Sequence, residues 1–219
     1  MPRIARIVAE GHPHHIVQRG NNKQAVFFDS EDKRFYLELL KKYSAECGNV
    51  VHAYCLMNNH VHILATPEHD DSLARAMQKL SLRFTQHINK KYKRTGRLWE
   101  CRFHSSVVDK EGYLWTVCRY IERNPVRAKI VSKPSQYEWS SASKNRRSDI
   151  VKSVWSEAEK QEYTDYLNGP EDKDQIDVIK KQTYSGKPIG SSKFIDHMAK
   201  ILKMDLNVKP RGRPRKKRG

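Results

Sequence analysis

The chain has 219 residues, with 42 Lys or Arg against 25 Asp or Glu, so its formal charge at pH 7 is +17. Such an excess of positive charge predicts attraction to a polyanion, and nucleic acid is the expected partner. No apolar stretch approaches the roughly 20 residues of a spanning helix and no signal peptide is recognised, so we expect a cytoplasmic, nucleoid-associated protein with no membrane partner.

Hydrophobic spacing and turn residues predict seven elements before Pro125. Alternating β-branched residues between turn signals indicate strands, and apolar residues at three- and four-residue steps indicate helices. In chain order, the elements are a strand at 14–19, a helix from Ser30 to Gly48, strands at 50–57 and 60–65 joined by the turn Asn58-Asn59, a helix at 71–92, a strand at 98–108 and a helix at 111–124. This order predicts an α+β fold, a ferredoxin-like (RRM-like) antiparallel sheet with helices on one face and an added C-terminal helix.

The pattern weakens after about residue 145, where short polar helices are expected near 156–167, 172–183 and 191–203. A chain of this length accommodates one catalytic domain and an appendage. We therefore predict three parts, with bounds 1–145 for the catalytic domain, 146–204 for a helical C-terminal extension and 205–219 for a disordered basic tail.

The predicted tail is a proline-broken run of basic residues that cannot fold alone. Its segment Pro210-Arg211-Gly212-Arg213-Pro214 resembles the core of an AT-hook. In that motif, extended arginines lie in the narrow minor groove of A·T-rich duplex DNA, which would be the role of Arg211 and Arg213. A nonspecific tether to DNA is the alternative interpretation.

The four cysteines are widely spaced, at Cys47, Cys55, Cys101 and Cys118. They lack the close pairs that zinc ribbons and redox motifs need. The spacing therefore predicts free, mostly buried thiols and no disulfide framework.

The strongest local signal for chemistry is His60-Val61-His62 on a predicted strand. Residues at i and i+2 of a strand point to the same face, so two imidazoles can converge on one cation. A site of this kind needs a further ligand from elsewhere and open positions for substrate. Two histidines on the solvent side of a half-buried strand are the alternative.

A second candidate group lies on the helix before Pro125, where Tyr120 and Asn124 are four residues apart and share one helical face. A tyrosine can act as a covalent nucleophile toward a phosphodiester, and the phosphotyrosine link conserves the energy needed for rejoining. An amide oxygen beside it can bind a metal. The alternative is that Tyr120 is a core aromatic and Asn124 a residue that ends the helix.

Several segments resemble, in order, the single-tyrosine HUH transposases (IS200-like), and especially their REP-associated relatives, the REP-associated tyrosine transposases. The resemblance covers about residues 12–145, and its motifs are specific as a set. The matching segments are His15-Ile16-Val17-Gln18-Arg19-Gly20-Asn21, Met57-Asn58-Asn59-His60-Val61-His62, Leu98-Trp99-Glu100-Cys101-Arg102-Phe103, Tyr120-Ile121-Glu122-Arg123-Asn124-Pro125-Val126-Arg127-Ala128 and Tyr137-Glu138-Trp139-Ser140-Ser141.

The resemblance implies a metal-dependent transposase that cuts and rejoins single-stranded DNA at palindromic hairpins through a 5′-phosphotyrosine. It implies that His60, His62 and Asn124 bind a divalent cation, Mg²⁺ or Mn²⁺, and that Tyr120 is the nucleophile. Tyr113 is the rival nucleophile, but Val117 stands where its downstream amide would be. Monomer and homodimer stay open, because relatives of both kinds exist.

Basic side chains around these motifs predict phosphate contacts with single-stranded and hairpin DNA. The candidates for DNA binding outside the tail are Arg19, Arg83, Arg102, Arg123 and Arg127. Solvated charge on a helix face is the alternative for each. A non-catalytic ferredoxin-like regulator that binds nucleic acid is the alternative function, since this topology also serves RNA-recognition domains.

Overall fold

A computed structural model describes residues 8–143, 149–151 and 156–203 of the chain. Its centre is a four-stranded sheet of order β2-β3-β1-β4, in which every neighbouring pair is antiparallel. The strands are β1 (His14–Arg19), β2 (Asn49–Met57), β3 (His60–Pro67) and β4 (His104–Val107). This is the strand order of a ferredoxin-like sheet, so the predicted fold class is confirmed.

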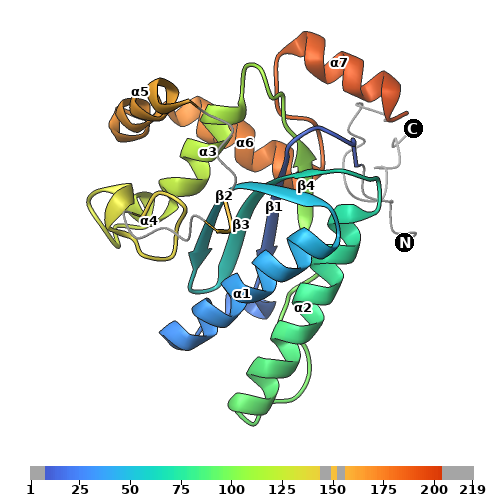
Figure 1. The fold of residues 1–219 in the computed structure, drawn as a ribbon, viewed down its shortest axis with the longest axis vertical. Helices are drawn as coiled ribbons and strands as arrows, with labels where there is room; N and C mark the ends of the chain where they lie inside the picture. Colours follow the sequence, from blue (N-terminus) through green and yellow to red (C-terminus); the bar gives the residue numbers. More distant parts are fainter. Residues whose placement is uncertain (1–7, 144–148, 152–155, 204–219) are drawn as a thin grey trace, which may run out of the picture.

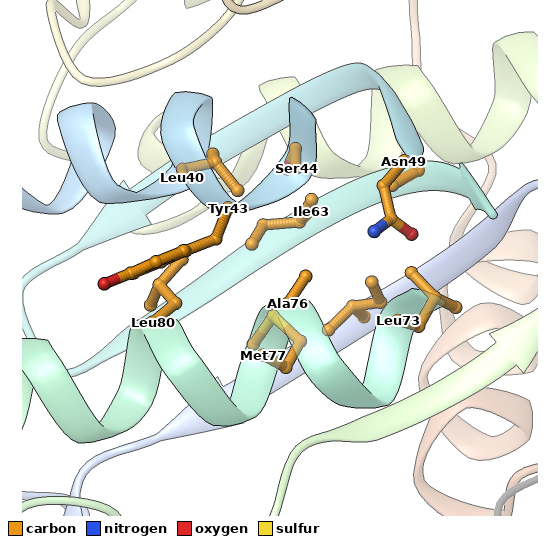
Figure 2. A pocket seen from close by; sticks show the side chains of 11 residues that line it. Leu40, Tyr43, Ser44, Asn49, Ile63, Leu73, Ala76, Met77 and Leu80 are labelled. Carbon is orange, nitrogen blue, oxygen red and sulfur yellow. The ribbon is translucent and has the colours of Figure 1, made fainter. Parts of the chain in front are cut away.

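The helices α1 (Ser30–Glu46) and α2 (Ser72–Lys91) lie side by side across one face of the sheet (Figure 1). Figure 2 shows part of the core: Leu40 of α1, Leu80 of α2 and Ile63 of β3 line the same small pocket between the two helices and the sheet. Removing these apolar side chains from water stabilises this layer. Ile63 belongs to the set of β3 side chains that point to this face, so its neighbours His62 and Leu64 point to the opposite one.

The helices that follow the fourth strand lie on the opposite face of the sheet or at its edge. They are α3 (Leu114–Glu122), α4 (Asn124–Arg127), α5 (Glu157–Asn168), α6 (Lys173–Ser185) and α7 (Ser192–Ile201). α3 contacts β2 and β3, whereas α6 contacts β4 and β1. The predicted layout with helices on one face therefore holds for α1 and α2, and α3, α4 and α6 form a second layer on the opposite face (Figure 1). α5 packs against α3, and α7 packs against Val107 of the edge strand β4.

Two predicted elements are shorter than the sequence pattern suggests. The strand expected at 98–108 is confined to β4, because the segment before it forms a loop with one isolated bridge, Gly20 to Trp99. Trp99 and Phe103 are buried in this loop. The aromatic residues of this segment are therefore explained by burial and not by strand pairing. The helix expected at 111–124 ends at Glu122, and Pro125 opens the separate short helix α4.

The three helices expected after residue 145 are confirmed as α5, α6 and α7. The division at residue 145 stays a prediction, and the tail at 205–219 lies outside the described residues. Among the residues that the structure describes, no helix is long and apolar enough to cross a membrane. The free thiols are confirmed, with Cys101 exposed and the other three cysteines buried.

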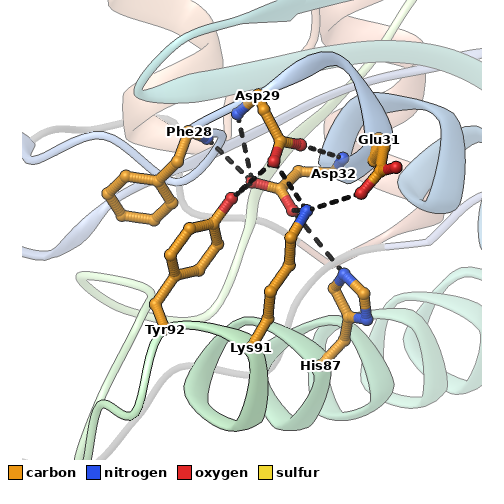
Figure 3. Close-up of polar contacts among 7 residues, drawn as sticks. All are labelled: Phe28, Asp29, Glu31, Asp32, His87, Lys91 and Tyr92. Atoms are coloured by element: carbon orange, nitrogen blue, oxygen red, sulfur yellow. Dashed lines mark hydrogen bonds and ion pairs between the residues drawn. The ribbon is translucent and has the colours of Figure 1, made fainter.

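A polar cluster ties the start of α1 to the end of α2 (Figure 3). Asp29 caps α1 and forms a capping box with Asp32. The buried Asp32 carboxylate also accepts hydrogen bonds from Lys91 Nζ at 3.0 Å and from Tyr92 Oη at 2.9 Å. A buried charge needs such partners, so this cluster fixes how the two helices meet on the face away from the histidine pair.

Candidate active site

The histidine pair stands at the start of β3, on the face covered by α3 and α6. The ring centroids of His60 and His62 are 5.0 Å apart and their planes are nearly perpendicular, at 82°. His62 is buried, with 4% of its surface exposed, and His60 is half-buried. Strand geometry thus places both imidazoles on one face, with His60 nearer to solvent.

One nitrogen of each imidazole is engaged by a neighbour. His60 Nδ1 lies 2.7 Å from Asn59 Oδ1, and the Asn59 amide nitrogen donates to the Lys23 carbonyl at 3.0 Å. His62 Nδ1 lies 2.9 Å from His15 Nε2. In both rings it is therefore Nε2 that is left to bind a cation.

His15 was missed as a site residue by the sequence analysis. It lies on β1, where Val17 pairs with His62, so His15 is the diagonal neighbour of His62 across the two strands. The two rings stack at 5.2 Å with an angle of 12° between their planes. The available signal was its position in the matching segment that begins at residue 15, but its role depends on strand register.

Tyr120 meets these imidazoles from α3. Its ring centroid is 5.6 Å from that of His62 and 5.5 Å from that of His15, and it presents an edge to both. Tyr120 is 6% exposed. The phenol therefore lies on the same side of the sheet as the histidine pair, which the proposed chemistry requires.

Asn124 follows one turn later and folds back onto the end of α3. Its side-chain nitrogen donates to the carbonyls of Tyr120 at 3.0 Å and Ile121 at 3.1 Å. These bonds satisfy carbonyls that the helix end leaves without a partner. The amide oxygen is then the atom of Asn124 that can act as a ligand.

The donor types offered by these side chains, two imidazoles and an amide oxygen, are ones that bind divalent cations. Among the described residues, no three or more His, Cys, Asp or Glu side chains gather as a metal site. A cation here would therefore rely on the two imidazoles, on the Asn124 oxygen and on substrate or water. A mixed set of imidazole and oxygen ligands suits first-row divalent ions and leaves room for a phosphate.

Burial controls the protonation of the site. Desolvation lowers the pKa of His60 to about 4 and that of His15 to about 3, and it holds the pKa of His62 well below its ordinary range. Desolvation also raises the pKa of Tyr120 to about 12, against the opposing effect of the Arg127 guanidinium. At neutral pH the imidazoles are neutral, as ligands must be, and the phenol is protonated.

Arg127 joins the site to the segment between α5 and α6. Its guanidinium lies 4.5 Å from the centroid of the Tyr120 ring, and its Nη1 lies 2.6 Å from Glu171 Oε1. Arg123 also contacts Glu171, at 3.1 Å, and donates to the Leu167 carbonyl at 2.7 Å. These two predicted DNA-binding residues thus hold the α5–α6 connection in place, and their phosphate contacts stay a prediction.

The other predicted DNA-binding arginines are dispersed. Arg19 pairs with Glu100 at 3.1 Å, and Arg102 is exposed in the loop before β4. Arg83 is exposed on α2, on the face away from the histidine pair. Arg211 and Arg213 lie outside the described residues. The structure therefore brings only some of the predicted basic residues near the imidazoles.

The rival nucleophile Tyr113 occupies the residue before α3. Seven residues separate it from Tyr120, which is about two helical turns. The Tyr120 ring contacts the rings of His15 and His62. Tyr113 instead packs against the apolar core. This placement favours Tyr120 as the residue that can face a phosphate.

The buried imidazoles predict a loss of stability in mild acid. For His14, His52 and His60 burial lowers the pKa from 6.5 to about 4, so the folded state resists protons that the unfolded state takes up. Below pH 6.5 each such histidine then lowers the free energy of unfolding by about 1.4 kcal/mol per pH unit. We expect the thermal unfolding midpoint in EDTA to fall steeply from pH 7 to pH 5, and a constant midpoint would contradict the burial of these rings.

Comparison with known proteins adds a family and a fold. A family model described as "Transposase IS200 like" matches residues 9–124. A REP-associated tyrosine transposase of Haemophilus influenzae is 27% identical over 114 residues, which are 47% of this chain and 64% of the relative. The chain thus spans less than two thirds of the length of that relative. A solved structure of a REP-associated tyrosine transposase bound to a REP hairpin shares the fold, with a TM-score of 0.56 and 17% identity over 71% of this chain and 94% of that one.

Proposed function

The chain belongs to the IS200-like transposase family, and from this premise we propose that it is a metal-dependent strand transferase acting on single-stranded DNA at palindromic hairpins. Tyr120 is the proposed nucleophile. The observation that carries the proposal is the contact of the Tyr120 ring with His62, at 5.6 Å between centroids. It brings a phenol from α3 onto His62 of β3, 58 positions earlier in the chain.

The proposed reaction is a transesterification at phosphorus. The Tyr120 oxygen attacks the scissile phosphate, the bond from phosphorus to the 3′-oxygen breaks, and a 5′-phosphotyrosine forms. The phenolic proton passes to solvent and the departing 3′-oxygen takes up a proton. Attack by another 3′-hydroxyl reverses the step and joins strands, and no ATP is needed because the ester energy is conserved.

Charges near Tyr120 affect how readily it attacks. Its pKa of about 12 leaves the hydroxyl protonated at neutral pH, and Arg127 over the ring favours the phenolate. A divalent cation, Mg²⁺ or Mn²⁺, held by His60, His62 and Asn124 would polarise the scissile phosphate. The side chains of this site thus orient the nucleophile and hold the cation ligands in their neutral form.

Hairpins of repetitive palindromes are the proposed substrate class. The Haemophilus influenzae relative carries REP association in its name, and the solved neighbour is bound to a REP hairpin. The positive charge of this chain, +17, suits a folded polyanion of this kind. We propose that this chain acts on DNA hairpins of the same class.

A covalent-adduct assay tests the function. The full-length protein is incubated with a 3′-labelled single strand that contains a palindromic hairpin, in Mn²⁺ or in EDTA, and separated on a denaturing gel. We expect a labelled protein band in Mn²⁺ and none in EDTA. A strand of equal composition with a scrambled stem is the matched control and should give much less adduct. Hairpin binding without any adduct would instead support the non-catalytic regulator.

A further inference from the structure

We propose that Thr183 and His15 form a hydrogen-bonded relay that holds His62 in the one neutral tautomer able to bind a cation. Thr183 lies on α6, in the C-terminal extension, 168 positions after His15. Neither residue touches the proposed substrate in this scheme, so both are positioning residues. The proposal rests on the proposed function, because that function gives the tautomer of His62 its role. The tautomers themselves are a property of the metal-free protein and can be measured without DNA.

The relay begins at the Thr183 hydroxyl, which has two partners within hydrogen-bond distance. Thr183 Oγ1 donates to the Ile179 carbonyl at 2.8 Å, one helical turn back on α6. A hydroxyl has one hydrogen, so toward any other partner Thr183 accepts. The His15 Nδ1 atom lies 2.8 Å from the same oxygen. His15 therefore carries its hydrogen on Nδ1 and donates it to Thr183.

The tautomer of His15 in turn determines which nitrogen of His62 carries the hydrogen. A neutral imidazole has one N–H and one lone pair, so His15 with its hydrogen on Nδ1 has an accepting Nε2. His62 Nδ1 lies 2.9 Å from that atom and must donate. The hydrogen of His62 is thus on Nδ1, and its Nε2 carries the lone pair that a cation needs.

The opposite direction would disable the ligand. If Thr183 donated to His15, then His15 would carry its hydrogen on Nε2 and donate to His62 Nδ1. His62 would in turn carry its hydrogen on Nε2, where a cation could not bind. Hydrogen-bond partners that fix the tautomer of a ligating histidine are a general feature of metal sites. Here the controlling partner comes from the extension.

His60 is held in the same tautomer by a different partner, Asn59. Its Nδ1 faces Asn59 Oδ1 at 2.7 Å, and the Asn59 amide nitrogen is directed to the Lys23 carbonyl. An amide oxygen only accepts, so His60 carries its hydrogen on Nδ1 as well. Both imidazoles then offer Nε2, and the site requires α6 for one of the two.

Nuclear magnetic resonance of the metal-free protein reads the tautomers directly. Histidines are labelled with ¹⁵N in the full-length chain at pH 7.5, and the His62 ring is assigned by its absence from the spectrum of His62→Gln. We expect His62 and His15 as Nδ1–H tautomers in the wild type. His62 as the Nε2–H tautomer overturns the proposal, whatever the protein does with DNA.

Substitutions at Thr183 test the origin of the relay. Thr183→Val keeps the shape and removes the acceptor, so we expect His62 to shift toward the Nε2–H tautomer and the Mn²⁺ dissociation constant, by titration calorimetry, to rise about 10-fold or more. Thr183→Ser restores the hydroxyl and should restore both values. Thr164→Val is the control for loss of the one-turn bond alone, because the exposed Thr164 hydroxyl makes the same bond on α5, to the Lys160 carbonyl at 2.7 Å.

The outcomes separate this proposal from the proposed function. An unchanged tautomer and unchanged Mn²⁺ affinity in Thr183→Val overturn the relay, even where the adduct assay succeeds. The expected tautomers without any adduct from hairpin DNA leave the relay supported and the transferase rejected. An equal loss of Mn²⁺ affinity in Thr164→Val would show a general effect of helix packing and would also overturn the relay.

Discussion

Replacing Tyr120 with Phe will abolish the covalent protein–DNA adduct and leave hairpin affinity nearly unchanged. The substitution removes only the hydroxyl. The ring remains to pack edge-on against His15 and His62 and beneath Arg127, so the fold and the cation ligands should be preserved. Loss of a nucleophile with retention of the rest of a site lowers the rate on the order of 10³-fold or more.

The measurement pairs a denaturing gel for the adduct with fluorescence anisotropy for hairpin binding. Tyr113→Phe is the matched control, since it removes the same atom from the rival residue two helical turns earlier and should keep the adduct. An adduct that persists in Tyr120→Phe and disappears in Tyr113→Phe would reassign the nucleophile. Loss of hairpin binding in Tyr120→Phe would show a structural role for the hydroxyl instead.

The strands and helices of the first half were predictable because their signals are local. β1 runs from His14 to Arg19 as expected, and the Asp29 cap opens α1 through a capping box with Asp32. The strand at 98–108 was overestimated, because buried aromatics in a loop share their composition with a strand. The amino-acid composition of a segment indicates whether it is buried. Whether it pairs as a strand depends on where the other strands of the sheet lie.

The residues of the candidate site also fall into those that local motifs predict and those that only the fold brings together. The motif residues His60, His62 and Tyr120 could be named from the sequence, and the structure brings His62 and Tyr120 into contact. His15 and Thr183 could not, because their meeting depends on the register of β1 against β3 and on the docking of α6. A hydrogen bond between side chains 168 positions apart produces no pattern in the sequence from which it could be predicted.

The arginines that follow Tyr120 illustrate a second limit. The concentration of basic residues around the motifs suggested phosphate contacts, yet Arg123 and Arg127 share Glu171 as a partner. Glu171 lies in the extension, where the sequence pattern is weak. The helices after residue 145 therefore reach the candidate site twice, through this carboxylate and through Thr183. The candidate site is thus built from the sheet and from these helices together.

Loss of either imidazole of the proposed cation site is expected to weaken cation binding and to abolish cleavage. His60→Ala and His62→Ala each delete an Nε2 donor, so the Mn²⁺ affinity should fall by more than the roughly 10–100-fold that an outer partner costs. Adduct formation should vanish in both, as it should for the wild type in EDTA. Hairpin affinity in EDTA should stay close to wild type, because charge-driven contacts depend on salt and not on the cation.

The matched control for these two variants is His52→Ala. His52 is a partly buried histidine of β2 whose pKa burial also lowers to about 4, but it contacts Thr66 at 2.7 Å and not the Tyr120 ring. It should bind Mn²⁺ and form the adduct like the wild type, with at most a lower unfolding midpoint. Adduct formation by His62→Ala, or by the wild type in EDTA, would show that the phosphate is activated without the histidine pair. Tyr120 would then act with Arg127 as the nearest charge, and the imidazoles would be structural.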